Sequence, residues 1–240
     1  TLNELFFGAM DRSASRPVAM RVKRGGTWVG TSFAELLSQV QAFSIGLHEL
    51  GVNAGDRLAI LSENRPEWAV TDFACLACRC ADVPVYPTLP AHQIEYILRD
   101  SGAVAVCCSS AAQLGKILEI RGNLPALKTI VVFDADAATG GAVTFDSVLA
   151  KGRAAIPKYP TWRADALAVK PDDLATLIYT SGTTGDPKGV MLTHGNITSD
   201  VMAGLQVLDL RQSDECLSFL PLSHIFERMA GHYCMTQQGA

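Results

Sequence analysis

The sequence has no strong surplus of either charge and no long apolar run. Among its 240 residues, 20 are lysine or arginine and 24 are aspartate or glutamate, so the net charge is −4. Without a basic surplus there is no reason to propose bulk binding to nucleic acid. The longest stretch without a charged residue, 101–115, has only 15 residues. Because a bilayer-spanning helix needs about 20 mostly apolar residues, no segment is predicted to span a membrane.

The chain also lacks the patterns that mark export and zinc binding. No basic segment followed by an apolar stretch stands at the start, so no secretory signal is identified. The seven cysteines are odd in number, and we expect them to be reduced thiols in a cytosolic protein. Cys75, Cys78 and Cys80 are close enough to suggest zinc, but no second CxxC or HxxxH pair follows them. We interpret them as small apolar side chains on a packed helix.

What the sequence does contain is the composition of a globular protein, with 48% apolar and 18% charged residues. Its length suits one large domain or two small ones. Residue 1 is threonine, and the last residues, 236–240, continue a helical pattern without a clear stop. We therefore expect the chain to be a piece of a longer protein.

Short apolar strands alternate with amphipathic helices along most of the chain. A capping box of Ser32 and Glu35 predicts the start of a helix that ends at Gly51. Strands are predicted at 58–61, 83–86, 103–107, 129–133 and 174–179, and further helices at 64–79, 91–100 and 111–121. Continuous apolar strands between helices indicate a layered α/β fold, with a mainly parallel sheet flanked by helices.

Three regions are predicted along the chain. They are a helical N-terminal region at about 1–55, an α/β region with a phosphate loop at about 56–210, and the start of a further subdomain at about 211–240. Several glycines and prolines in 135–171 indicate an irregular stretch with a short helix at 145–151.

The most informative segment is 180–189, which holds three glycines, three threonines, one serine and one lysine. Glycine lets backbone N–H groups turn toward a ligand, hydroxyls add donors, and lysine adds a mobile positive charge. The segment therefore predicts a polyphosphate site, with a simple hairpin turn as the alternative. It is not a Walker A loop, because Pro187 stands where that motif has glycine before lysine, and Lys188 lies between Pro187 and Gly189.

Two stretches carry a resemblance to a known family. Residues 179–196, YTSGTTGDPKGVMLTHGN, resemble the signature of the AMP-binding, adenylate-forming superfamily, which includes acyl-CoA synthetases, luciferases and the adenylation domains of peptide synthetases. Residues 221–228, PLSHIFER, are similar to a segment of long-chain fatty acid–CoA ligases. The resemblance implies the N-terminal part of the family's large domain, with the C-terminal domain absent.

The resemblance implies a reaction in two halves. A fatty acid carboxylate attacks the α-phosphorus of ATP and releases pyrophosphate, and the thiol of coenzyme A then displaces AMP from the acyl adenylate. Mg²⁺ is the implied metal. The residues implied to hold the β- and γ-phosphates are Thr180, Ser181, Gly182, Thr183, Thr184, Gly185 and Lys188, with Thr180 also contributing to the magnesium site.

Other site residues are implied less directly. His224 would lie where the acyl and nucleotide sites meet, or would simply fill a packed turn. Arg228 stands where relatives carry an aromatic gate of the acyl tunnel, so it would either replace that gate or pair with Glu227. Asn196 is interpreted as the N-cap of a helix over 197–207.

The family's magnesium glutamate, ribose-binding aspartate and adenylation lysine are expected beyond residue 240. The 240-residue chain alone is therefore expected to be inactive and, with apolar surface exposed, to self-associate. Alternatives are a ligase for aryl, medium-chain or other carboxylates, and a non-catalytic nucleotide-binding α/β module. We expect a cytoplasmic location and leave peripheral membrane contact of the full-length protein open.

Overall fold

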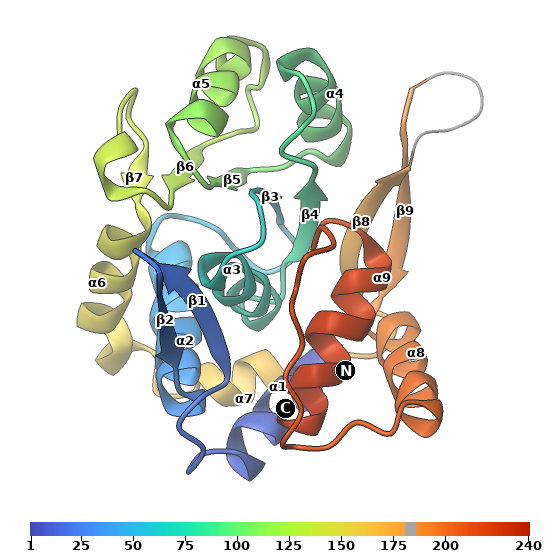
Figure 1. The fold of residues 1–240 in the computed structure, drawn as a ribbon. Coiled ribbons are helices and arrows are strands. Elements are labelled where there is room, and N and C mark those ends of the chain that lie inside the picture. Colours follow the sequence, from blue (N-terminus) through green and yellow to red (C-terminus); the bar gives the residue numbers. More distant parts are fainter. Residues whose placement is uncertain (181–185) are drawn as a thin grey trace.

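The computed structural model of the chain describes residues 1–180 and 186–240. Its centre is a seven-stranded sheet in the order β7-β6-β5-β3-β4-β8-β9 (Figure 1). The strands, in chain order, are β3 (Arg57–Leu61), β4 (Ala81–Val85), β5 (Ala105–Cys108), β6 (Thr129–Val132), β7 (Val143–Thr144), β8 (Leu174–Thr180) and β9 (Lys188–Thr193). Neighbouring strands run parallel except β8 and β9, which are antiparallel. The predicted α/β fold with a mainly parallel sheet is therefore confirmed.

Helices cover both faces of this sheet (Figure 1). One face carries α4 (Ala91–Ser101) and α5 (Ala111–Ile120), and the other carries α2 (Phe33–Glu49), α3 (Pro66–Ala77) and α6 (Phe145–Ala155). The remaining helices are α1 (Leu2–Arg12), α7 (Trp162–Leu167), α8 (His194–Val207), α9 (Ile225–Glu227) and α10 (Met235–Gln238). Short 3₁₀ turns lie at η1 (Arg121–Asn123), η2 (Ala135–Ala137) and η3 (Ile156–Lys158), and η4 (Arg228–Cys234) is a π-helical stretch.

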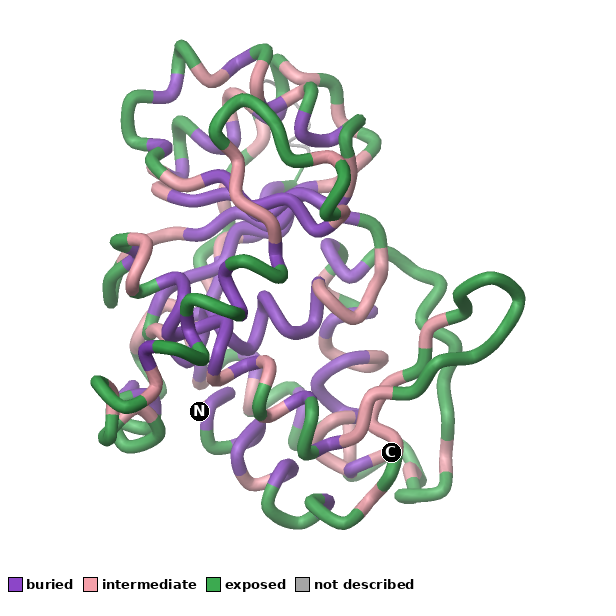
Figure 2. Tube along the Cα trace, turned by 90° about the vertical axis from the view of Figure 1, so that its left-hand side faces the viewer, coloured by how far each residue is buried: buried purple, intermediate pink, exposed green. Residues whose placement is uncertain are grey.

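The strand pleat divides the interior into two cores. In β3, Ala59 and Leu61 belong to the core under α4 and α5, whereas Leu58 and Ile60 belong to the core on the opposite face. Successive side chains of a strand point to opposite faces, so a strand covered on both sides is apolar throughout. Figure 2 shows the buried residues concentrated along the sheet and its neighbouring helices. None of the helices within 1–180 and 186–240 has the length and apolarity needed to cross a bilayer.

The predicted boundaries of α2 are confirmed. Ser32 caps the helix, and its side chain and that of Glu35 form the expected capping box. Gly51 follows the helix with φ of 88°, a conformation that glycine adopts without strain. By contrast, α8 begins one turn earlier than predicted: Thr193 is its N-cap, and Asn196 closes the capping box from the third helical position. Naming Asn196 as the cap was therefore wrong.

The first 55 residues contain more than helices. A hairpin of β1 (Met20–Arg24) and β2 (Thr27–Thr31) turns through Gly25 and Gly26, both with positive φ. Most of its residues are exposed or half-buried, so no alternation of apolar and polar residues marked it in the sequence.

Residues 135–171 are more ordered than predicted. The helix expected at 145–151 extends to Ala155, and α7 follows where no helix was expected. Gly152 suggested a loop, but it lies inside α6 where that helix touches α2. A Cβ at Gly152 would lie 1.7 Å from the carbonyl oxygen of Ala42, and one at Gly46 would lie 2.3 Å from that of Val148. Both glycines serve close helix packing, so the interpretation of Gly152 as a loop signal was wrong.

Candidate functional site

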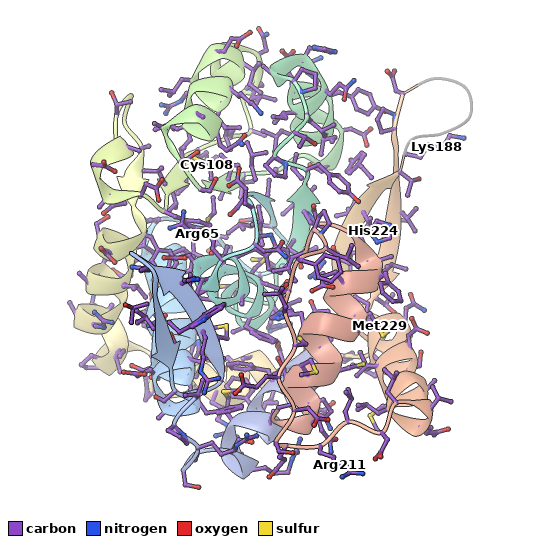
Figure 3. The ribbon with its side chains drawn as sticks, viewed as in Figure 1. Arg65, Cys108, Lys188, Arg211, His224 and Met229 are labelled. Atoms are coloured by element: carbon purple, nitrogen blue, oxygen red, sulfur yellow. The ribbon has the colours of Figure 1, made fainter. Side chains whose placement is uncertain are left out.

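The β8–β9 ribbon brings the two ends of the predicted phosphate loop together. Thr180 at the end of β8 pairs in register with Lys188 at the start of β9, and both are exposed. Residues directly opposite in an antiparallel pair place their side chains on the same face. A hydroxyl and an ammonium group therefore stand side by side at the edge of the sheet, and Figure 3 shows Lys188 there. The loop's other predicted phosphate-binding residues, Ser181, Gly182, Thr183, Thr184 and Gly185, lie outside the described residues.

Tyr179, near the end of β8, anchors the β8–β9 ribbon to α4. Its hydroxyl donates to the carboxylate of Asp100 on α4 at 2.6 Å. Burial, followed by this hydrogen bond, raises the pKa of the Tyr179 hydroxyl, so it stays protonated. Tyr179 pairs across the ribbon with Gly189, where a Cβ would lie 3.0 Å from the tyrosine ring. A glycine after Lys188 thus makes room for the ring that anchors β8 to α4.

His224 lies at the start of α9, and its side chain is exposed (Figure 3). Its Nδ1 accepts the backbone N–H of Phe226 at 3.2 Å, so His224 caps this short helix. Because Nδ1 accepts, the proton of the neutral ring is on Nε2. No hydrogen bond joins His224 to Thr180 or Lys188 in the part of the chain that the structure describes, and its role at the reacting carboxylate remains a prediction.

The ionic partners of Arg228 are distant carboxylates and not its neighbour Glu227, so the alternative of a local Glu227–Arg228 pair was wrong. The side chain is fully buried and bonds both Asp72 of α3 and Asp82 of β4. Its Nη1 also donates to the hydroxyl of Thr176 on β8 at 2.9 Å. A buried guanidinium is stabilised by charged hydrogen-bond acceptors around it, and the two fully buried carboxylates of Asp72 and Asp82 supply them. A role of Arg228 in the acyl site remains a prediction.

The two carboxylates of this buried cluster have pKa values shifted in opposite directions. Burial alone would raise the pKa of Asp72, but Arg228 and His232 hold it below its usual value. Burial raises the pKa of Asp82 to about 7, although Arg228 opposes the rise. His232 Nε2 lies 3.1 Å from Asp72, and the Tyr233 hydroxyl donates to the same carboxylate at 3.0 Å. Removing one member of such a cluster costs about 3–5 kcal/mol, because the others are left buried without a partner.

Sequence reasoning missed Asp72, Asp82 and Thr176. A signal was present: Asp82 stands in the apolar strand ADVPV, and Asp72 in the apolar helix segment TDFACLA. A carboxylate in a segment buried on all sides needs a cationic partner. The sequence could have predicted that a partner exists, but not which of the chain's 20 lysines and arginines it is.

The described residues do not complete a magnesium site. Thr180 offers one exposed hydroxyl oxygen, whereas Mg²⁺ needs six oxygen ligands, usually including one or two carboxylates. Within 1–180 and 186–240, no group of three or more His, Cys, Asp or Glu side chains is arranged to hold a metal. The contribution of Thr180 to a magnesium site therefore remains a prediction.

The clustered cysteines lie at the end of α3. Cys75 and Cys80 are buried and Cys78 is half-buried, all as free thiols. The thiol of Cys78 donates to the carbonyl of Ser44 at 3.2 Å, and that of Cys80 to the carbonyl of Asn53 at 3.0 Å. This packing agrees with their interpretation as small interior side chains.

A groove of about 800 Å³ opens elsewhere on the molecule. Residues of the β1–β2 hairpin, the start of α3, the segment after β6 and α6 line it, and Thr180, Lys188 and His224 do not. The volume of this groove therefore says nothing about the candidate site. The groove carries more acidic than basic side chains, which disfavours a phosphate ligand there.

The chain belongs to the family of AMP-binding enzymes, whose sequence pattern it matches over residues 8–240. The resemblance seen in 179–196 is thereby confirmed. The chain is 38% identical over 205 residues to the long-chain-fatty-acid–CoA ligase FadD15 of Mycobacterium bovis, covering 85% of this chain and 33% of that protein. It is 35% identical over 249 residues to the peroxisomal long chain acyl-CoA synthetase 7 of Arabidopsis thaliana, covering 95% of this chain and 33% of that protein.

The fold agrees with that assignment. The crystal structure of the anthranilate CoA ligase AuaEII in complex with anthranoyl-AMP superimposes with a TM-score of 0.83 at 24% identity, covering all of this chain and 43% of that one. The chain spans about a third of the length of the curated relatives it matches.

Proposed function

We propose that the full-length protein carrying this chain activates a fatty acid to its acyl adenylate and transfers the acyl group to coenzyme A. The carrying observation is the β8–β9 ribbon, which sets Thr180 opposite Lys188 at the two ends of a glycine- and hydroxyl-rich loop. The 31–38% identity to proteins named as long-chain fatty acid–CoA ligases supports the substrate class.

The chemistry asks the protein mainly to neutralise and orient charge. In the first half-reaction, a carboxylate oxygen bonds to the α-phosphorus of ATP, and the bond to the pyrophosphate oxygen breaks. Negative charge grows on the departing pyrophosphate. The ammonium group of Lys188 is exposed beside the predicted phosphate loop and would stabilise that charge. In the second half-reaction, the coenzyme A sulfur bonds to the acyl carbon and AMP leaves. ATP, Mg²⁺ and coenzyme A are thus the proposed cofactor and co-substrates.

We propose that the full-length protein acts in the cytoplasm, where ATP and coenzyme A are available, and that any contact with membranes is peripheral. Its other ligands would be a fatty acid and no nucleic acid, in keeping with a net charge of −4.

The test is exchange of labelled pyrophosphate into ATP by the full-length protein, with fatty acids from short to long. This exchange reports the adenylation half-reaction without coenzyme A. We expect exchange that depends on a long-chain acid, and thioester formation once coenzyme A is added.

The other outcomes separate the alternatives. Exchange with aryl or short acids only would keep adenylation but reject the long-chain assignment. A folded protein that exchanges with no acid in the presence of Mg²⁺ would be better described as a non-catalytic nucleotide-binding module.

A further inference from the structure

The strand that leads into the predicted phosphate loop shares only a short backbone ladder with the parallel sheet. β4 pairs with β3 along five residues, but with β8 at only one position, Asp82 opposite Thr176. Pro84 in β4 has no N–H to donate, which shortens the ladder on this side. Side-chain contacts between β8 and β4 therefore add to this short ladder.

Those side chains meet at Arg228. The Thr176 hydroxyl donates to Asp82 at 2.8 Å and accepts from Arg228 at 2.9 Å, and Arg228 also bonds Asp82 directly. All three residues have no exposed surface. The guanidinium further lies over the rings of Trp68 and Tyr233, at 5.6 and 5.4 Å from the ring centroids. It is thus enclosed by protein atoms and locked in one orientation.

The same arginine also touches the segment that carries His224. Its backbone N–H donates to the carbonyl of His224 at 3.1 Å, one helical turn earlier. Thr176 lies four residues before Thr180 on β8. Arg228 therefore connects the two segments, through its side chain to Thr176 on β8 and through its backbone N–H to the turn that presents His224.

We propose that Arg228 is a positioning residue that holds β8 and the His224 turn in fixed relation. The inference rests on the proposed function, since it assigns a task within adenylation. It replaces the idea of a gate: a gating side chain must swing between open and closed positions, whereas this guanidinium would have to leave two buried carboxylates to move. Losing it should slow the chemical step for every acid, because misplacing reacting groups by about 1 Å is costly.

The first measurement is hydrogen exchange of backbone amides in Thr176→Val, which removes the hydroxyl but keeps the shape and both ion pairs. We expect exchange at least 10-fold faster in 188–193 and 224–228, with α5 unchanged. Equal acceleration in α5 would indicate general destabilisation and overturn the proposal, as would unchanged exchange in both segments. This readout needs no activity, so it decides the positioning role even if the protein proves not to be a ligase.

The second measurement is pyrophosphate exchange by the full-length protein. Arg228→Lys and Thr176→Val are compared with Arg211→Gln, a control that changes an exposed arginine. We expect kcat at least 10-fold lower at every acyl chain length, with KM for the acid within about twofold. Unchanged kcat in both variants would overturn the proposal. Variants that keep the wild-type kcat but prefer a different acyl chain length would also overturn it, and would indicate that Arg228 acts in the acyl site. Absence of exchange in the wild type would instead refute the proposed function.

Discussion

Several single residues are held by contacts that reach far across the chain. His194 at the start of α8 is fully buried, and its Nδ1 accepts the backbone N–H of Leu2 at 3.2 Å. Burial lowers the pKa of His194 to about 4, below its ordinary value of 6.5. The imidazole therefore stays neutral in the folded protein at pH values where the unfolded chain protonates it.

This difference predicts an acid-dependent loss of stability. Between pH 6.5 and about 4 the unfolded state binds a proton that the folded state does not, so the free energy of unfolding falls as pH falls. From pH 7.5 to 5, urea unfolding should show the wild type losing about 2 kcal/mol more than His194→Gln, whose amide does not titrate. The exposed His92→Gln is the matched control and should follow the wild type. Equal losses in wild type and His194→Gln would contradict the prediction.

Lys188 is the residue expected to stabilise the departing pyrophosphate. In the full-length protein, Lys188→Met should lower kcat for pyrophosphate exchange by about 100-fold, because it removes a cation from the departing pyrophosphate. Lys151→Met, which changes an exposed lysine on α6, should leave kcat unchanged. A Lys188→Met protein with wild-type kcat would show that the lysine is a solvated surface residue.

At the scale of elements, α2 and α6 approach closely because glycine stands on both sides of their contact. Ala at position 152 would place its Cβ 1.7 Å from the carbonyl oxygen of Ala42, whereas a Cβ at Gly115 in α5 would meet nothing within 4 Å. Both glycines lie inside helices, so their intrinsic helix propensities are comparable.

The two alanine substitutions should therefore act in opposite directions. Gly152→Ala should destabilise the protein by about 2 kcal/mol or more, since the helices must move apart. Gly115→Ala should stabilise it by up to about 1 kcal/mol through helix propensity alone. Denaturant midpoints of both variants check this. A Gly152→Ala protein as stable as the wild type would mean that the helices separate at no cost.

Elements were predictable where local pattern and tertiary packing agree. The capping box at Ser32 and the apolar strand 58–61 needed only neighbouring residues, and both are confirmed. The β1–β2 hairpin and α7 were not predicted, because their residues show no strong apolar periodicity. Gly152 was wrongly interpreted as a loop residue, because glycine is common both in loops and at close helix contacts.

Over the whole molecule, most of the exposed large apolar side chains among the described residues lie in one part of the sequence. Between residues 190 and 226 they are Val190, Met191, Met202, Val207, Leu208, Leu217, Phe219, Leu220 and Phe226. Leu217 and Phe219 are 72% and 74% exposed in a segment without regular structure. Apolar surface of this extent favours association.

We therefore expect the 240-residue chain by itself to self-associate. Light scattering should give an average mass that rises with protein concentration, and replacing Leu217 and Phe219 by serine should reduce the rise. A chain that scatters as a monomer at the highest attainable concentration would contradict this expectation.

The amino-acid sequence alone was enough to predict the alternation of helices and strands, the mainly parallel sheet, and the family to which residues 179–196 point. These follow from periodicities and motifs within a few residues, where local geometry is dictated by the residue types. By contrast, Arg228 bonds Asp72 and Asp82, which lie 156 and 146 residues away, and this pairing could be found only in the folded chain. A charge buried in an apolar segment demands a partner, but which one it meets depends on how the sheet and helices bring distant segments together.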